Sequence, residues 1–124
     1  LSKDPDVRDN LVEIYIKTEI ARLFGMRNFW LAHGQRPRSY EGPQLSYYEK
    51  MSGLAISELI LDILGPYAIT KDGRWGPLAG AIELQQRTGI VEIHPGGTAD
   101  IQKVIMARRI GIGRTAREQA GALA

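Results

Sequence analysis

The stretch DPDVRDNLVEIYIKTEIARLFGMRNFWLAHG, residues 4–34, decides the fold of this chain. It opens with Asp4 as a helix N-cap and Pro5 at the first helical position, and Gly34 closes it. These signals predict one helix over residues 5–33, which is about 44 Å long at 1.5 Å per residue. A helix of this length sets the long dimension of the domain.

The remainder of the chain divides into three further helical segments between turn signals. We predict helices over residues 44–64, 77–88 and 98–112. Gly65-Pro66 ends the second helix, Pro77 begins the third, which ends near Gly89, and Thr98 caps the fourth. Four helices with short connections predict an all-α, up-down four-helix bundle that occupies residues 1–124 as a single domain.

The composition excludes several classes of protein. The chain has 124 residues, a length that suits one domain, and its net charge is +2. It contains no cysteine, which excludes disulfide scaffolds, thiol nucleophiles and thiolate metal sites. Its two histidines, His33 and His94, are far apart in the sequence, so we expect no metal site. No run of consecutive apolar residues approaches the roughly 18 needed to span a bilayer, so we expect a cytoplasmic protein without a membrane span.

The first predicted helix carries two apolar stripes. One stripe contains Val7, Leu11, Ile14 and Ala21, and the second contains Val12, Ile16, Leu23 and Trp30. The stripes lie about 140° apart at 100° per residue. We interpret the second stripe as a surface for absent domains or sister subunits. The alternative is one broad core-facing stripe with ordinary exposed apolar residues. Because the chain begins at Leu1 and not at Met, we also expect it to be a fragment of a longer protein.

The C-terminal region is basic. Residues 98–124 carry Lys103, Arg108, Arg109, Arg114 and Arg117 against Asp100 and Glu118. A basic helix can meet phosphates, which keeps a nucleic-acid-binding module open as an alternative function. A solvated helix face is the simpler interpretation, and the near-neutral remainder of the chain argues against nucleic acid.

The segment Gly96-Gly97-Thr98 has the features of a ligand-binding turn. The two glycines expose backbone N–H groups and permit positive φ. Thr98 follows as an N-cap, so the positive end of a helix dipole faces out of a tight loop. Such a helix end suits a phosphate or a polar ligand group. The same residues are also typical of an ordinary helix cap.

The run HPGGTADIQKVIMAR, residues 94–108, closely resembles the C-terminal signature of the acyl-CoA dehydrogenases. In that family a Gly-Thr-Ser-Glu/Gln-Ile-Gln-Arg run opens the last long helix. The matching positions here are Gly97, Thr98, Ile101, Gln102, Ile105, Ala107 and Arg108. Arg87 matches an arginine ten residues before the motif glycine. Asp62-Ile-Leu-Gly65 resembles the family's Gln-X-X-Gly-Gly turn, and the resemblance covers nearly the whole chain.

This resemblance implies the C-terminal helical bundle of a three-domain flavoprotein. The family's members are oxidoreductases of fatty-acid and lipid metabolism that bind FAD and form dimers or tetramers of sister subunits. They catalyse α,β-dehydrogenation of an acyl-CoA substrate and pass electrons to an electron-transfer flavoprotein. The expected function is therefore FAD binding and oligomerisation, and the fragment alone is expected to be inactive. The alternative is a non-catalytic helical assembly partner.

The resemblance also implies roles for particular residues. Gly97 and Thr98 match the FAD-contacting loop, Asp100 occupies the position of a cofactor-contacting Gln or Glu, and Gly65 matches a turn that approaches a neighbouring subunit's FAD. The chain departs from the pattern at Asp62, which replaces a Gln, and at Pro66, which replaces the second Gly.

No catalytic base is assignable within the chain. Many members carry the catalytic glutamate immediately before the motif glycine, but here that position is Gly96, which has no side chain. Glu83 and Glu92 are the nearest carboxylates, and a surface or helix-end position is the simpler interpretation of both. For His94 and Arg87, a structural role is at least as consistent with the sequence as a ligand contact.

Overall fold

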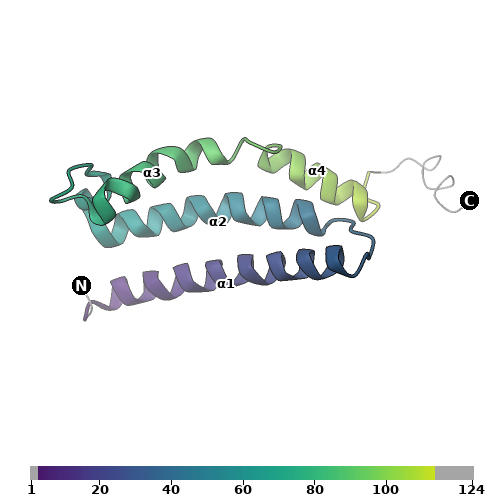
Figure 1. Ribbon diagram of the computed structural model, residues 1–124, viewed down its shortest axis with the longest axis horizontal. Coiled ribbons are helices and arrows are strands. Elements are labelled where there is room, and N and C mark those ends of the chain that lie inside the picture. Colours follow the sequence, from purple (N-terminus) through teal and green to yellow (C-terminus); the bar gives the residue numbers. More distant parts are fainter. Residues whose placement is uncertain (1–2, 114–124) are drawn as a thin grey trace, which may run out of the picture.

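The computed structural model describes residues 3–113, which form four α-helices and two short 3-10 helices (Figure 1). The elements are α1 (Pro5–His33), α2 (Glu41–Leu64), η1 (Gly65–Ile69), η2 (Pro77–Gly80), α3 (Ala81–Glu92) and α4 (Ala99–Arg109). The all-α class and the four helices predicted from the sequence are confirmed.

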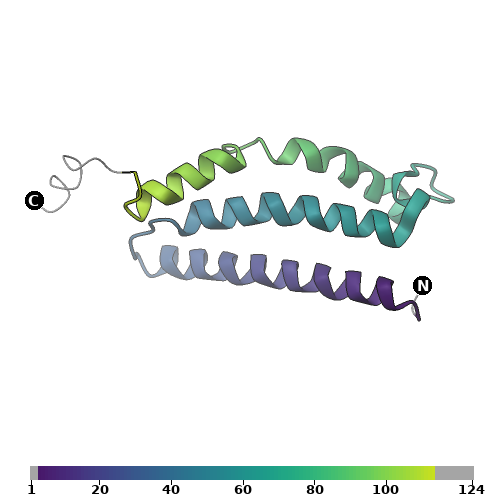
Figure 2. The same ribbon diagram turned by 180° about the vertical axis from the view of Figure 1, so that it is seen from behind.

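The helices form three antiparallel rows (Figures 1 and 2). α1 is one outer row and α2 is the central row, while α3 and α4 follow each other end to end along the other side of α2. Within the described residues, α1 contacts α2 but neither α3 nor α4. The central position of α2 explains why apolar residues occupy much of its circumference, since it packs against neighbours on two sides.

The bounds of α1 agree with the prediction. The Asp4 carboxylate accepts a hydrogen bond of 3.0 Å from the Asp6 N–H, which caps the first turn. At the other end, the Gly34 N–H donates to the Trp30 carbonyl at 3.0 Å. Local signals alone therefore fix both ends of this helix.

The predicted start of the second helix, at residue 44, is three residues too late. α2 begins at Glu41 and includes Gly42 and Pro43 in its first turn. The sequence pattern makes Pro43 a breaker, but a proline in the first turn removes only an N–H that has no partner within the helix.

The predicted third helix, residues 77–88, is wrong at both ends. Residues 77–80 form η2, in which Leu78 and Ala79 have positive φ, and α3 begins at Ala81. At its other end α3 continues through Gly89 to Glu92, four residues beyond the predicted end. Gly89 is buried, and an added Cβ atom there would lie 3.5 Å from the Ser57 hydroxyl oxygen. This glycine therefore serves close packing on α2 and does not end the helix.

The fourth helix is shorter than the predicted residues 98–112. Thr98 is the N-cap, as expected, but α4 ends at Arg109. The Gly111 N–H then bonds the Arg108 carbonyl, and Gly111 has a φ of +91° that terminates the helix. Arg114, Arg117 and Glu118, on which part of the basic C-terminal charge depends, lie outside the described residues.

One helical stretch, Glu41–Ile69, is long and apolar enough to cross a membrane by length and composition alone. Counting consecutive apolar residues misses it, because Glu49, Lys50 and Glu58 interrupt the run. The stretch contains α2, and a central helix with apolar neighbours on two sides passes the same test.

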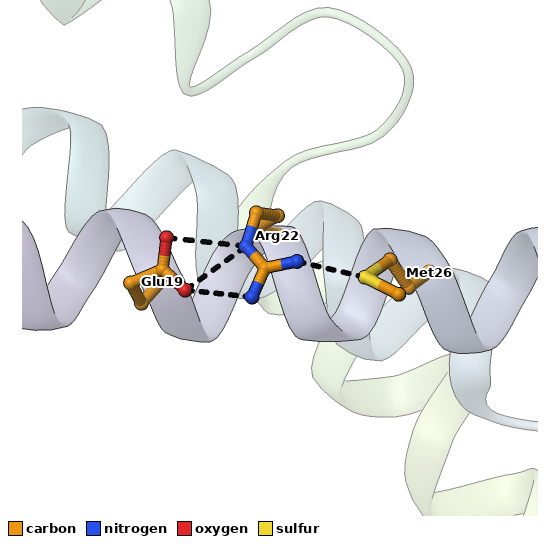
Figure 3. Close-up of polar contacts among 3 residues, drawn as sticks. All are labelled: Glu19, Arg22 and Met26. Atoms are coloured by element: carbon orange, nitrogen blue, oxygen red, sulfur yellow. Dashed lines mark hydrogen bonds and ion pairs between the residues drawn. The ribbon is translucent and has the colours of Figure 1, made fainter.

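The outer face of α1 is largely apolar and exposed. The second predicted stripe, Val12, Ile16, Leu23 and Trp30, is 56%, 45%, 54% and 55% exposed, so it faces away from α2. In the middle of this outer face, Arg22 pairs with Glu19 at 2.8 Å and reaches the Met26 sulfur (Figure 3). Within the described residues, no part of the chain covers this face.

Candidate functional site

The candidate site is the loop of residues 93–98, which joins α3 to α4 over the middle of α2 (Figure 1). At its end, the Thr98 hydroxyl oxygen accepts a hydrogen bond of 3.3 Å from the Ile101 N–H. Thr98 itself is extended, with φ −61° and ψ 163°, as an N-cap residue requires. The predicted cap at the start of α4 is confirmed.

The two glycines of the loop adopt a backbone conformation that other residues rarely reach. Gly96 has a φ of +69° and Gly97 a φ of +92°. A Cβ atom added at Gly97 would lie 3.1 Å from Gln102 Nε2 and 3.5 Å from Ile101 Cγ2. The same atom at Gly96 would meet nothing within 4 Å. Gly97 is therefore required both by its backbone angle and by close packing against α4.

Two side chains from different helices hold the carbonyl groups of this loop. Gln102 is 6% exposed, and its Nε2 donates to the Gly96 carbonyl at 2.8 Å. Lys50 reaches up from α2, and its Nζ donates to the Glu92 carbonyl at 3.1 Å and to the Pro95 carbonyl at 2.6 Å. Sequence analysis does not identify either contact, although Lys50 is the single basic residue of α2.

The N–H groups of residues 96–98 differ from the carbonyl groups of the loop, which are hydrogen-bonded to side chains. Within the described residues, the N–H groups of Gly96, Gly97 and Thr98 donate no hydrogen bond. The N–H groups of Ala99 and Asp100 lie in the first turn of α4, where the helix itself supplies no acceptor. This set of donors, together with the positive end of the helix dipole, fits an anionic or hydrogen-bond-accepting group such as the phosphates and hydroxyls of a nucleotide cofactor.

Asp100 lies in the first turn of α4 and points into solvent. Its side chain is 87% exposed and forms an ion pair of 3.2 Å with Lys103. The hydrogen bond that Lys103 donates to the Asp100 carboxylate raises the pKa of Lys103, and the nearby Tyr47 contributes further. A carboxylate in the first turn of a helix interacts favourably with the dipole, so Asp100 also has a structural reason to be there.

The carboxylates considered as catalytic bases do not converge on the loop. Glu83 is 12% exposed at its side chain and pairs with Arg87 at 3.1 Å and with Lys71 at 3.8 Å. The ion pair with Glu83, one turn earlier on α3, also explains the position of the Arg87 side chain. Glu92 is exposed at the end of α3 and lines a pocket of about 190 Å³ together with Lys50.

His94 is likewise exposed, and its described hydrogen bond is from its N–H to the Val91 carbonyl. This bond continues the last turn of α3 into the loop.

Gly65 lies at a different part of the molecule from Gly97. It caps the end of α2 with φ +54° and ψ −132°, and its N–H bonds the Leu61 carbonyl. The part of α2 between Lys50, which touches the loop, and Gly65 is about 22 Å long at 1.5 Å per residue. Asp62 and Pro66 beside it are both exposed. The structure therefore separates the two glycine turns that the family pattern associates with cofactor contacts.

The chain belongs to the acyl-CoA dehydrogenase family, because the model for "Acyl-CoA dehydrogenase, C-terminal domain" matches residues 1–111. The solved structure of the ChsE4-ChsE5 complex from Mycobacterium tuberculosis contains the same fold, with a TM-score of 0.77 over 90% of this chain and 23% sequence identity. The chain spans 29% of the length of that subunit. No curated protein shows significant sequence similarity to it.

Proposed function

We propose that this chain is the FAD-binding and oligomerisation domain of an acyl-CoA dehydrogenase. The observation that carries the proposal is the loop of residues 96–98, where the carbonyls are held inward and the N–H groups remain available. Membership of the acyl-CoA dehydrogenase family supports FAD as the ligand, and FAD carries phosphates and hydroxyls that accept hydrogen bonds.

Gly97 and Thr98 would hold the cofactor; when bound, FAD would supply a hydride acceptor for the β-carbon of an acyl-CoA thioester and a route for electrons to an electron-transfer flavoprotein. The role of this chain is to bind and orient the cofactor. Gly97 and Thr98 contact it, Asp100 lies beside it, and Gly65 approaches the cofactor of a sister subunit. Because Gly96 has no side chain, the base that takes the α-proton comes from elsewhere in the intact protein, and the chain alone is inactive.

The test compares two helix N-caps, at Thr98 and at Asp4. Thr98→Ala and Asp4→Ala each remove a side-chain oxygen that accepts an N–H in the first turn of a helix, and each costs about 1 kcal/mol of stability. In the intact protein, Thr98→Ala is expected to lower the flavin-to-protein ratio, measured by flavin absorbance after purification. Asp4→Ala is the matched control and keeps its flavin. Equal flavin content in both variants contradicts the proposal.

The apolar outer face of α1 supports the assembly part of the proposal. Met26, Phe29 and Trp30 are all more than half exposed there, and a contiguous apolar face is typical of an interface. We propose that another domain of the parent or a sister subunit covers it. Leu23→Glu in this face is expected to reduce the assembled mass of the intact protein, whereas Leu78→Glu in η2 leaves it unchanged. Identical masses exclude this face as a subunit interface.

A second candidate is a non-catalytic assembly partner, which the absence of a carboxylate at Gly96 favours. An intact protein that retains flavin but oxidises no acyl-CoA substrate supports this alternative. A nucleic-acid module gains little support from α4, where Lys103 is already paired with Asp100. The cytoplasmic location expected from the sequence stays a prediction.

A further inference from the structure

We propose that Lys50 is a positioning residue for the flavin-binding loop: it holds the loop in the orientation that directs backbone N–H groups toward the cofactor. The inference rests on the proposed function, because it assigns to Lys50 a role in the site formed by Gly97 and Thr98. Lys50 itself is half-buried in α2 beneath the loop and is not placed in contact with the cofactor.

The geometry joins three separate elements through one ammonium group. Lys50 Nζ donates to the carbonyl of Glu92, the last residue of α3, and to the carbonyl of Pro95 in the loop. The Lys50 residue is half-buried in the central helix. An ammonium group has three donors on a flexible stem, so it can serve both carbonyls at once. Its charge is also favourable at the C-terminal end of the α3 dipole.

The planarity of the peptide bond transmits this contact to the donors of the loop. In a trans peptide, the C=O of one residue and the N–H of the next point in opposite directions within a rigid plane. Lys50 holds the Pro95 carbonyl, and therefore turns the Gly96 N–H away from α2. Gln102 holds the Gly96 carbonyl, and therefore fixes the Gly97 N–H in the same way. The two side chains control successive peptide planes.

Lys50 is needed because the glycines cannot fix these planes themselves. Gly96 has open space around its Cα and a φ of +69°, so local sterics leave its neighbouring peptide planes free to rotate. A ligand that binds the loop then has to order it, which weakens binding. Lys50 orders the loop in the unbound protein, so the ligand does not have to order it on binding.

The experiment measures FAD affinity in the apo form of the intact protein, by quenching of flavin fluorescence well below the unfolding temperature. Lys50→Met keeps the aliphatic stem and removes the donors, and it is expected to weaken FAD binding about tenfold. Lys50→Gln, whose shorter side chain cannot reach both carbonyls, is expected to weaken binding similarly if the Met variant does not fold. Lys50→Arg restores most of the affinity, because its guanidinium also donates to two acceptors.

The control is Lys17→Met, which removes the ion pair with Glu13 on α1 and is expected to leave FAD affinity unchanged. The NMR order parameters of the Gly96 and Gly97 amides in the apo protein give a readout without cofactor, and they should fall in Lys50→Met alone. A purely structural Lys50 lowers the unfolding temperature but leaves FAD affinity and these order parameters unchanged, which overturns the inference. If Thr98→Ala weakens FAD binding and Lys50→Met does not, only the role of Lys50 fails. If neither does, the proposed function fails.

Discussion

Two connections between helices, residues 34–40 and residues 93–98, are held by opposite chemistry. In the first, the Glu41 carboxylate accepts the Ser39 N–H at 2.9 Å and pairs with Arg27 at 3.2 Å. In the second, Lys50 and Gln102 donate to carbonyl groups. In the first connection a side-chain carboxylate therefore binds a backbone N–H group. In the second connection, side-chain N–H groups bind backbone carbonyls.

This difference determines what each connection can still bind. In the first connection, acceptors within the chain bind the N–H groups of four residues, Gly34, Gln35, Arg36 and Ser39. The second uses up its carbonyls and leaves N–H groups at a helix N-terminus, which is the arrangement that receives an anionic or hydrogen-bond-accepting ligand. The two connections therefore differ in which backbone groups are already hydrogen-bonded within the protein.

The largest expected effect on stability is at Gly97, because the second connection requires a positive φ at this residue. Gly97→Val places a branched side chain at φ +92° against Gln102, and we expect a loss of about 2–3 kcal/mol in the free energy of unfolding. Gly53→Ala in α2 is the control with the opposite sign. No atom lies within 4 Å of its added Cβ, so we expect a gain of about 1 kcal/mol. Urea titration of both variants checks the prediction, and a neutral Gly97→Val would contradict the packing described for the loop.

A smaller effect is expected at Glu41, in the first connection. The Ser39 N–H lowers the pKa of Glu41, with further contributions from its own backbone N–H and from Arg27. Because the pKa is lower in the folded state, the charged carboxylate stabilises the fold above its ordinary pKa of 4.5, and this stability is lost as pH falls through the lowered value.

Glu41→Gln is therefore expected to lower the unfolding midpoint at pH 7 and to flatten its dependence on pH below 4.5. Glu13→Gln, on the exposed side of α1, is the control and retains the wild-type acid dependence. FAD affinity should not change in either variant, since the first connection is not the binding loop. A loss of flavin in Glu41→Gln would remove the distinction between the two connections.

The smallest effect is expected at Asp100, beside the second connection. Its side chain is exposed and paired only with Lys103 among the described residues, so Asp100→Asn should cost about 0.5 kcal/mol through the helix dipole. Flavin affinity then decides the role of Asp100. A clear change in affinity supports a cofactor contact, and an unchanged affinity assigns Asp100 to the helix end alone.

Local signals in the sequence predict the helix ends that depend on one residue. Asp4 and Thr98 both cap the helices that they were expected to cap. Pro43 and Gly89 mislead, because a proline in a first turn and a glycine at a helix crossing both resemble breakers when the neighbouring helix is unknown. The sequence does not show which helix packs against these two residues, so it cannot distinguish a helix interior from a helix end.

The side chains that hold the loop of the candidate site are the features least predictable from the sequence. The glycines and Thr98 are adjacent in the chain, so their combination is visible in the sequence. Lys50, however, meets Pro95 across 45 residues, and this contact depends on how α3 and α4 follow α2. The resemblance in the sequence indicates the family, but the side chains that hold the loop are found only in the three-dimensional arrangement.

The measurement that tests the central claim most directly is amide hydrogen exchange of the intact protein with and without FAD. The account predicts that FAD slows exchange at Gly96, Gly97 and Thr98 and leaves exchange at Ser39 and Tyr40 unchanged. Equal protection of the two connections, or no protection at residues 96–98 in a protein that binds FAD, would contradict it.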